Sequence, residues 1–335
     1  MKILHLPTEI AGQVNLSARG LRAIGVDAYN TARPNPYGYA VDIDPRITWL
    51  PFLKNTRDPF LFFRWLNEFD LFHYHKSPYL PGGLDIKFLK NNNKPFVVEF
   101  WGSDIRLQDM EKKRNPYFVG DNADNQKRKR ARLMFWSENT DEVIFSDHSA
   151  DIFLKPYFKK IHVVGQRVDT ALYTPKYPSP LTTCPKILHA PSVKATKGTK
   201  YVKRAIEDLN KAGLDFEYIE VSGVSHKEAV QIYSEADIII DQLMLGSHGA
   251  FACEAMALGK PVICYILDEL VETYPDGFPI VNANPDNIAA VLEELICSPQ
   301  KRHEIGMKSR GYVEKVHDIR VVAKKLLAIY NTAML

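Results

Sequence analysis

Short apolar runs alternate with longer segments in which apolar residues recur every three or four positions. A short continuous apolar run is typical of a strand buried on both faces, and the longer spacing is typical of an amphipathic helix. The runs predict strands at 2–6, 47–50, 69–75, 94–100, 142–146, 161–164, 187–190, 216–221, 238–240, 262–266 and 277–281. Helices are predicted at 14–24, 60–66, 199–212, 227–236, 250–258, 285–296, 299–315 and 319–330.

This alternation of strands and helices predicts an α/β protein with parallel sheets, and 335 residues are enough for about two domains. Prolines 175, 178, 180 and 185 interrupt the pattern, as expected of a linker about which two domains close. The predicted parts are an N-terminal Rossmann-like domain at 1–165, a linker at 166–185, a C-terminal Rossmann-like domain at 186–318 and a C-terminal helix at 319–335.

Composition narrows the class of protein. With 45% hydrophobic and 25% charged residues, the chain suits a folded globular protein. A formal net charge of +3 is too small to indicate nucleic-acid binding, and no apolar run approaches the roughly 20 residues that cross a bilayer. The first residues lack a signal-peptide pattern, and the four cysteines are scattered without the spacing of a zinc site. We therefore expect a cytoplasmic protein without a metal.

The stretch from Gly246 to Cys264 carries the clearest chemical signal. Gly246 and Gly249 follow a strand-like run, and residues 250–258 are almost all strong helix formers. The backbone N–H groups at the start of such a helix attract phosphate. Glu254 is the one polar side chain in this helix, and it is placed to accept hydrogen bonds from ribose hydroxyls. The alternative is a plain turn between strand and helix that binds nothing.

This stretch reads Gly-x-x-Gly-x-x-x-x-Glu-Ala-Met-Ala-x-Gly-x-Pro-Val-Ile from Gly246, and it resembles the nucleotide-sugar motif of glycosyltransferase family 4. The resemblance implies the GT-B fold, in which two Rossmann-like doubly wound domains face each other across a cleft. In that family two glutamates lie eight positions apart, the first at the donor sugar and the second at the ribose. Glu254 stands at the second position and Gly246 at the first.

The resemblance also implies the other donor-binding residues. The family places two basic side chains on the diphosphate; here Lys197 fits one position, Ser192 stands at the other, and Lys194 is the substitute. One of Asp241 and Gln242, just upstream of Gly246, is expected to supply the missing contact to the sugar. The donor-binding candidates are Gly12, Ser192, Lys194, Lys197, Asp241, Gln242, Ser247, His248, Gly249, Ala250, Phe251 and Glu254.

Catalytic candidates come from the N-terminal half. His75 lies at the carboxyl end of a predicted strand, the edge that faces the ligand crevice in open α/β sheets, although packing in the core is the alternative for it. Asp104 follows the next predicted strand, where helix capping is the alternative role. The family commonly has a His-Gly pair here, and this chain has Trp101-Gly102.

Basic residues crowd the start of a predicted helix, at Lys127, Arg128, Lys129, Arg130 and Arg132. The simplest interpretation is a solvated helix face. The alternative is contact with a membrane surface or an anionic acceptor. Anionic lipid contributes only about 1 kcal/mol per basic residue, so a solvated face remains the simpler interpretation. The localisation that we expect is therefore cytoplasmic, with membrane association as the alternative.

The activity implied by the resemblance is transfer of a sugar from a nucleoside-diphosphate donor to a glycan or lipid-linked acceptor hydroxyl. Transfer would retain the anomeric configuration and would need no metal or cofactor. Two alternatives remain open: a nucleotide-sugar epimerase of the same fold, and a catalytically inactive nucleotide-sugar-binding protein. The inactive alternative rests on Gly246 and Trp101, which replace residues expected of active relatives.

Overall fold

The computed structural model describes residues 1–32, 38–46, 58–120 and 122–335. Contacts between residues divide the chain into two units. Unit 1 comprises Met1–Leu107, Asn122–Arg167 and Ile319–Leu335, and unit 2 comprises Gln108–Asp121 and Val168–Asp318. The strand predicted at 47–50 lies outside the described residues.

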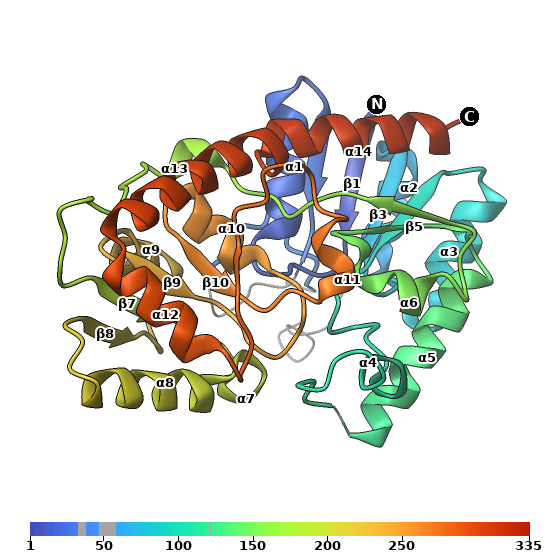
Figure 1. The fold of residues 1–335 in the computed structure, drawn as a ribbon. Coiled ribbons are helices and arrows are strands. Elements are labelled where there is room, and N and C mark those ends of the chain that lie inside the picture. The colour runs from blue at the N-terminus through green and yellow to red at the C-terminus, as the bar shows by residue number, and fades with distance from the viewer. Residues whose placement is uncertain (33–37, 47–57, 121) are drawn as a thin grey trace. The chain divides into compact units, whose positions relative to one another are not determined.

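Unit 1 is built on a six-stranded parallel sheet with the order β2-β1-β3-β4-β5-β6 (Figure 1). The strands are β1 (Lys2–Leu6), β2 (Asp27–Asn30), β3 (Leu71–His75), β4 (Phe96–Glu99), β5 (Glu142–Phe145) and β6 (Lys160–Val163). The helices are α1 (Gln13–Ala23), α2 (Pro59–Glu68), α3 (Leu84–Asn91), α5 (Ala123–Ser137), α6 (Asp151–Leu154) and α14 (Ile319–Ala333). The near-continuous apolar strand sequences follow from this arrangement, because helices cover both faces of a parallel sheet.

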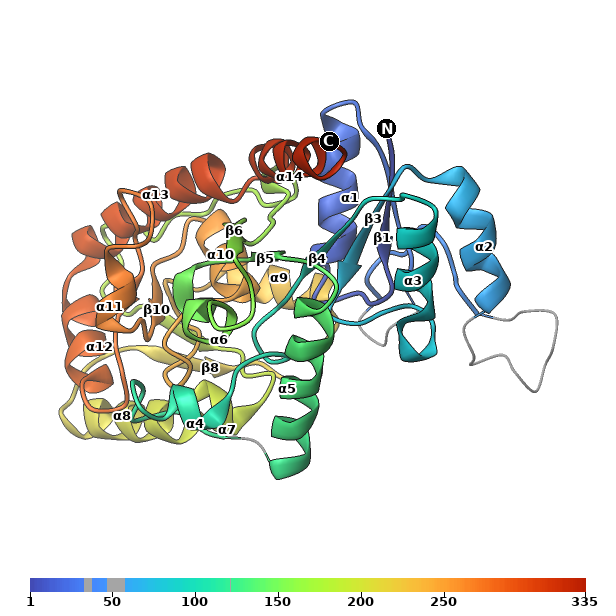
Figure 2. The same ribbon diagram turned by 90° about the vertical axis from the view of Figure 1, so that its right-hand side faces the viewer.

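Helices α1 and α14 lie side by side on one face of this sheet (Figures 1 and 2). They approach closely at Gly20, where a Cβ atom would lie 2.4 Å from the carbonyl oxygen of Ile319. The other face is packed with aromatic rings. Phe62 of α2 lies 6.0 Å from Phe72 of β3, and Trp136 of α5 lies 5.4 Å from Tyr74.

Unit 2 is built on a five-stranded parallel sheet with the order β11-β10-β9-β7-β8. Its strands are β7 (Lys186–His189), β8 (Glu217–Glu220), β9 (Ile238–Ile240), β10 (Val262–Cys264) and β11 (Val281–Asn282). Its helices are α4 (Gln108–Glu111), α7 (Lys194–Lys197), α8 (Thr199–Lys211), α9 (His226–Ser234), α10 (Ala250–Ala257), α11 (Asp268–Val271), α12 (Ile288–Cys297) and α13 (Pro299–Val316).

Two apolar clusters show that both faces of the second sheet are covered. One cluster joins the sheet to α8 and α12, which pack against each other (Figure 1). The other joins it to α9, α10 and α13. Successive residues of one strand therefore face opposite clusters, as Ile238 and Ile239 of β9 do. The predicted α/β architecture of two doubly wound, Rossmann-like domains is confirmed.

The division of the chain differs from the predicted boundaries in two places. Helix α14, predicted as a separate C-terminal segment, packs against α1 and belongs to unit 1. Residues 108–120 belong to unit 2, where Asn115 Nδ2 donates to the carbonyl oxygen of Met244 at 3.0 Å. The chain therefore passes between the units four times, and the predicted linker at 166–185 is only one of these passages.

Several local elements also differ from the sequence prediction. The last strand is β11 at 281–282 rather than 277–281, and the predicted loop at 191–198 contains the short helix α7. Helices α3, α4, α6 and α11 were not predicted. Among the helices of the described residues, none combines the length and the apolar character that crossing a bilayer requires.

The close approach at Gly20 makes a testable prediction. Changing Gly20 to alanine should lower the free energy of unfolding by about 1–3 kcal/mol, because the new methyl group would overlap the carbonyl of Ile319 and push α14 from α1. Urea unfolding of the full chain measures this change. The matched control is Gly311→Ala in the exposed part of α13, where no atom lies within 4 Å of the Cβ position and stability should hold or rise by up to about 1 kcal/mol. Equal effects of the two changes would contradict the role of Gly20.

Candidate functional site

The start of α10 is the most open part of the glycine loop. Gly249 precedes the helix, no side chain caps this start in the described structure, and the space around the Gly249 Cβ position is empty to 4 Å. Gly249, Ala250 and Phe251 are each half-buried, so this part of the chain is partly exposed to solvent. An uncapped helix start offers its N–H groups and a partial positive charge to an anion.

Gly246 has no room for the glutamate that its position carries in the family motif. Its φ of +74° is in the left-handed region, and a Cβ atom would lie 2.6 Å from Cγ of Leu267. The Gly246 carbonyl also accepts a hydrogen bond from the Leu267 amide at 3.0 Å. Leu267 therefore fills the place from which a side chain at 246 would start.

Lys197 is held at the carboxyl end of β9. Its ammonium group makes an ion pair with Asp241 Oδ1 and donates to Gln242 Oε1 at 2.9 Å. The Lys197 side chain is only 14% exposed, and that of Asp241 is fully buried. The Gln242 amide in turn donates to the carbonyl oxygen of Ser247. One chain of contacts thus connects the basic side chain to the glycine loop.

These contacts change the expected role of two residues. One of Asp241 and Gln242 was expected to turn toward a sugar. In the structure Asp241 contacts Lys197, and Gln242 contacts both Lys197 and the backbone of Ser247. Their burial, with 1% and 5% of the residue exposed, agrees with a supporting role.

Glu254 lies on α10 with its carboxylate near the surface, where the side chain is 11% exposed. His226, the first residue of α9, contacts Glu254 Oε1 through Nε2 at 3.0 Å. This hydrogen bond raises the pKa of His226. Nothing in the sequence indicates this partner, since only the capping box of Ser225 and Glu228 marks the start of α9.

The other two diphosphate candidates are more exposed. Ser192 lies on the surface of the loop after β7. Lys194 forms an ion pair with Glu220 Oε1 at 2.8 Å, and Lys203 of α8 pairs with the second oxygen at 3.0 Å. The contact with Lys194 lowers the pKa of Glu220. The structure thus groups Lys197 with the glycine loop and places Lys194 with the neighbouring strand end.

His248 does not project from the loop. Its ring lies 5.2 Å from Tyr274 and 5.6 Å from Phe278, and its Nδ1 is 3.6 Å from the Cys253 sulfur. Only 6% of the residue is exposed. It stabilises the loop by packing in this aromatic group.

His75 is completely buried, so it lies in the core rather than on an accessible surface as a catalytic residue would. Its Nε2 is 3.1 Å from His5 Nδ1, and its ring lies 4.2 Å from that of His73. Burial is the main cause that holds the pKa of all three histidines well below the usual value. The strand-end position of His75 was predicted correctly, and its burial agrees with the alternative of packing in the core.

The same three histidines are the group that suits a metal by spacing within the described residues, with ligand atoms within 4.8 Å of one another. Glu99 lies 3.3 Å from His73 Nε2, but Arg167 already binds both of its oxygens. Within the cluster, His5 and His75 share one hydrogen bond, and His73 Nδ1 lies 2.7 Å from the hydroxyl of Tyr330.

Asp104 is also structural. Its Oδ1 accepts a hydrogen bond from the Trp101 amide at 3.0 Å, and only 3% of the residue is exposed. Burial raises the pKa of its carboxyl group. Asp104 therefore holds the turn after β4, and this contact is not a helix cap because the next helix begins only at Gln108.

Gly12 lies at the start of α1 with a φ of +78°. The carboxylate of Glu9 accepts hydrogen bonds from the amides of Val14 and Asn15 at 3.2 and 2.9 Å, so this helix start already holds an anionic side chain. Burial raises the pKa of Glu9. Glu9 was missed because its contacts depend on how the chain turns around Gly12.

The five basic residues of α5 do not form one surface. Lys127, Arg128 and Arg130 are exposed. Lys129 is buried and donates to the carbonyl oxygen of Arg106 at 3.0 Å, and Arg132 donates to that of Asp104 at 2.6 Å. Two of the five thus help to fix the turn after β4.

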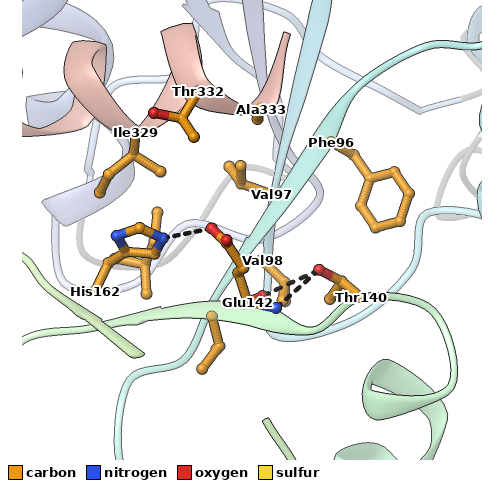
Figure 3. Close-up of a pocket in the computed structure, with 11 residues that line it drawn as sticks. Phe96, Val97, Val98, Thr140, Glu142, His162, Ile329, Thr332 and Ala333 are labelled. Atoms are coloured by element: carbon orange, nitrogen blue, oxygen red, sulfur yellow. Dashed lines mark hydrogen bonds and ion pairs between the residues drawn. The ribbon is translucent and has the colours of Figure 1, made fainter. Parts of the chain in front are cut away.

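Unit 1 also contains a cavity of about 200 Å³ (Figure 3). It is bounded by the amino ends of β4 and β5, by His162 and by the end of α14. Figure 3 shows the His162 ring directed at Glu142, with an Nε2 to Oε2 distance of 2.7 Å. Ligands of open α/β sheets bind at the carboxyl ends of the strands, so this cavity is not the candidate site.

The sequence match to a known protein family lies within unit 2. Residues 197–312 match the sequence model of the family described as Glycosyl transferases group 1. The matched segment includes Lys197, the glycine loop and Glu254. The resemblance to glycosyltransferases is confirmed over the residues that carry it.

Two curated relatives are similar over part of the chain. An uncharacterized glycosyltransferase of Methanocaldococcus jannaschii is 25% identical over 155 residues, which are 45% of this chain and 40% of that protein. An MMP alpha-(1->4)-mannosyltransferase of Mycolicibacterium hassiacum is 28% identical over 117 residues, which are 34% of this chain and 28% of that protein. The match thus spans less than half the length of either relative.

A solved structure of Anabaena HepE in complex with UDP-glucose resembles the whole chain. Its TM-score is 0.61 at 14% identity, with 99% of this chain and 100% of that chain covered. This likeness shows the fold, which is GT-B with two Rossmann-like domains.

The contacts of Lys197 predict a stability effect. Changing Lys197 to methionine should lower the free energy of unfolding by roughly 2–4 kcal/mol, because it leaves the buried Asp241 without its cation. The added change Asp241→Asn should recover much of that loss. Lys203→Met is the matched control, since its pair with Glu220 is half exposed and should contribute less than about 1 kcal/mol. Urea unfolding measures both losses. If Lys197→Met lowers the free energy of unfolding no more than Lys203→Met does, Lys197 is not held as described.

The buried histidines predict a pH dependence. Their pKa values are lowered by burial, so the unfolded chain takes up protons before the folded chain does, and stability is lost as the pH falls below about 6.5. We expect the urea midpoint to fall between pH 7.5 and 5, and to fall less steeply for His5→Gln. Parallel pH profiles of the variant and the natural chain would show that the cluster does not cause the effect.

Proposed function

We propose that this chain, whose residues 197–312 match the Glycosyl transferases group 1 family, is a glycosyltransferase of the retaining, hexosyl-transferring type. It would move a sugar from a nucleoside diphosphate to an acceptor hydroxyl in glycan, polysaccharide or glycolipid synthesis. One observation carries the proposal: Lys197, the open start of α10 and Glu254 all lie along the glycine loop of one sheet.

The chemistry of transfer explains this set of groups. Negative charge develops on the diphosphate as it leaves the sugar, and fixed positive charge stabilises that transition state. Lys197 is fixed by Asp241 and Gln242, and the amides of Gly249 to Phe251 are fixed by the helix. We propose that these groups supply the positive charge, so that transfer proceeds without a metal ion.

Glu254 is proposed to bind the ribose of the donor. Its carboxylate is the acceptor for His226 in this structure, and a ribose hydroxyl would donate to the same group. The donor base and sugar are best sought first among uridine diphosphate sugars, because HepE, which shares the fold, is described with UDP-glucose.

The sugar itself is proposed to contact the loop backbone. Leu267 occupies the space beside Gly246, and Asp241 and Gln242 are engaged with Lys197 and Ser247. The open space at Gly249 is the part of the loop where a sugar ring meets no side chain. Sugar selectivity would then depend on backbone groups rather than on a carboxylate.

A catalytically inactive nucleotide-sugar-binding protein is the second candidate. The burial of His75 and Asp104 favours it, because both residues expected to act in catalysis lie in the core. A nucleotide-sugar epimerase is less favoured, since its chemistry needs such groups within reach of the donor.

Thermal unfolding with a panel of nucleotide sugars tests the proposal. A ligand at 100 times its dissociation constant stabilises the folded state by about 2.7 kcal/mol, which raises the melting temperature. Release of nucleoside diphosphate that depends on an added acceptor would support transfer, and it should persist in EDTA. Binding without any release would favour the inactive candidate, and conversion of the donor without acceptor would favour the epimerase.

The role of Glu254 gives a separate prediction. Glu254→Gln should raise the dissociation constant of the nucleoside diphosphate roughly 10- to 100-fold, because each hydrogen bond to a charged group contributes about 1.5–3 kcal/mol. Isothermal titration calorimetry measures the constant. His226→Gln is the control, since it keeps the carboxylate and removes only its present partner. Unchanged affinity in Glu254→Gln would remove this residue from the site.

A further inference from the structure

A groove of about 410 Å³ lies in unit 1 at the carboxyl end of β3. It is formed between residues 76–83, which follow β3, and helix α5, the long green helix of Figure 2. Its volume falls within the range of about 300–1,000 Å³ that ligand pockets occupy. The lining residues are Lys76, Ser77, Pro78, Leu80, Gly82, Gly83, Arg128, Ala131, Arg132, Phe135 and Trp136.

The lining combines apolar surface with positive charge. Leu80 and Trp136 are buried in its wall, whereas Arg128 is exposed and Lys76 and Arg132 are half-buried. The lining contains three basic side chains and no carboxylate. A ligand with an apolar portion and a negative charge would therefore be complementary to it.

The backbone of the groove is held in an uncommon conformation. Lys76 has a φ of +75°, which residues other than glycine rarely adopt. Its amide donates to the Glu99 carbonyl at 3.0 Å, and its own carbonyl accepts from Trp136 Nε1 at 3.1 Å. Conformations of this kind persist where the surroundings fix them, and they gather at ligand sites.

Gly83 lets the two walls of the groove approach each other. Its φ is +69°, and a Cβ atom would lie 2.4 Å from Phe135 Cζ. On the opposite wall, Arg132 donates to the Asp104 carbonyl at 2.6 Å, which fixes the position of its guanidinium. The groove is thus shaped by contacts on both sides.

We propose that this groove binds the acceptor, and that the acceptor joins an apolar chain to a phosphate group. Its role as the acceptor site depends on the proposed transferase function, whereas binding of such an amphiphile does not. A hydroxyl-rich glycan needs many hydrogen-bonding partners, and apart from the basic side chains only Ser77 offers a polar side chain here. The phosphate would contact Lys76, Arg128 and Arg132, and the chain would lie against Leu80 and Phe135.

Three probes separate the parts of this ligand. Dodecyl phosphate has both the chain and the phosphate, dodecyl maltoside has the chain with a neutral sugar head, and inorganic phosphate has the head alone. Calorimetry below the micelle concentration, on the full chain, should show binding of dodecyl phosphate and at least about tenfold weaker binding of the other two, because each lacks one of the two favourable contributions. Equal binding of dodecyl maltoside, or of inorganic phosphate, would overturn the proposal in favour of a purely apolar groove or a simple anion site.

Two matched pairs of variants place the probe in the groove. Ala131→Glu adds a negative charge to the lining and should abolish measurable binding of dodecyl phosphate, whereas Ala131→Gln has nearly the same size and should keep it. Arg128→Ala should raise the dissociation constant about fivefold, which is the effect of losing one basic residue. Its control is Lys127→Ala, because Lys127 is exposed on the same helix but lies outside the lining. This change should alter the dissociation constant less than about twofold. Binding that survives Ala131→Glu would show that the probe binds elsewhere.

The outcome also separates this proposal from the transferase assignment. If dodecyl phosphate binds in the groove while no nucleotide sugar raises the melting temperature, the amphiphile site stands and the transferase proposal fails. If a nucleotide sugar binds while dodecyl phosphate does not, the groove proposal fails alone. Circular dichroism of each variant confirms that it is folded.

Discussion

The ion pair between Glu99 and Arg167 is the contact around which unit 1 is organised. Both side chains are fully buried, with 2.7 Å between Arg167 Nη1 and Glu99 Oε1. Gln13 of α1 exchanges two hydrogen bonds with the Arg167 backbone, at 2.7 and 3.0 Å. Breaking such a buried pair typically costs about 3–5 kcal/mol, so this contact fixes β4, α1 and the residue at which the chain leaves unit 1. His73 and His75 pack against the same carboxylate, which explains why a strand-end position did not make them accessible.

The sequence predicted most of the fold because local pattern and burial agree in parallel sheets. Apolar runs such as 238–240 form strands, and the residues of the glycine loop and Glu254 were predictable from the sequence. What it could not predict depends on side chains that are distant in the chain: His226 beside Glu254, Asp241 beneath Lys197, and Leu267 against Gly246. Polar and charged side chains near the glycine loop were predicted to face the ligand. In the structure Lys197, Asp241 and Gln242 contact one another.

Two different uses of positive charge follow from this structure. In unit 2, Lys197 is paired with the buried carboxylate of Asp241. The attraction between the two charges offsets the free-energy cost of removing each of them from water. In unit 1, the groove beside α5 gathers three basic side chains whose lining offers no carboxylate. The first arrangement gives a rigid cation suited to a fixed phosphate geometry. The second leaves charge to be neutralised by whatever occupies the groove.

The four passages of the chain between the units have a consequence for how the protein is made. During synthesis, the strands of unit 1 leave the ribosome first, but the apolar face that α14 covers stays open until residues 319–333 follow. The α14 residues Val322, Leu326 and Tyr330 are therefore the last to pack against the first sheet. Domains usually fold one after another from the N-terminus. Here one face of the first sheet stays uncovered while all of unit 2 is translated, and exposed apolar surface of this kind favours aggregation during folding.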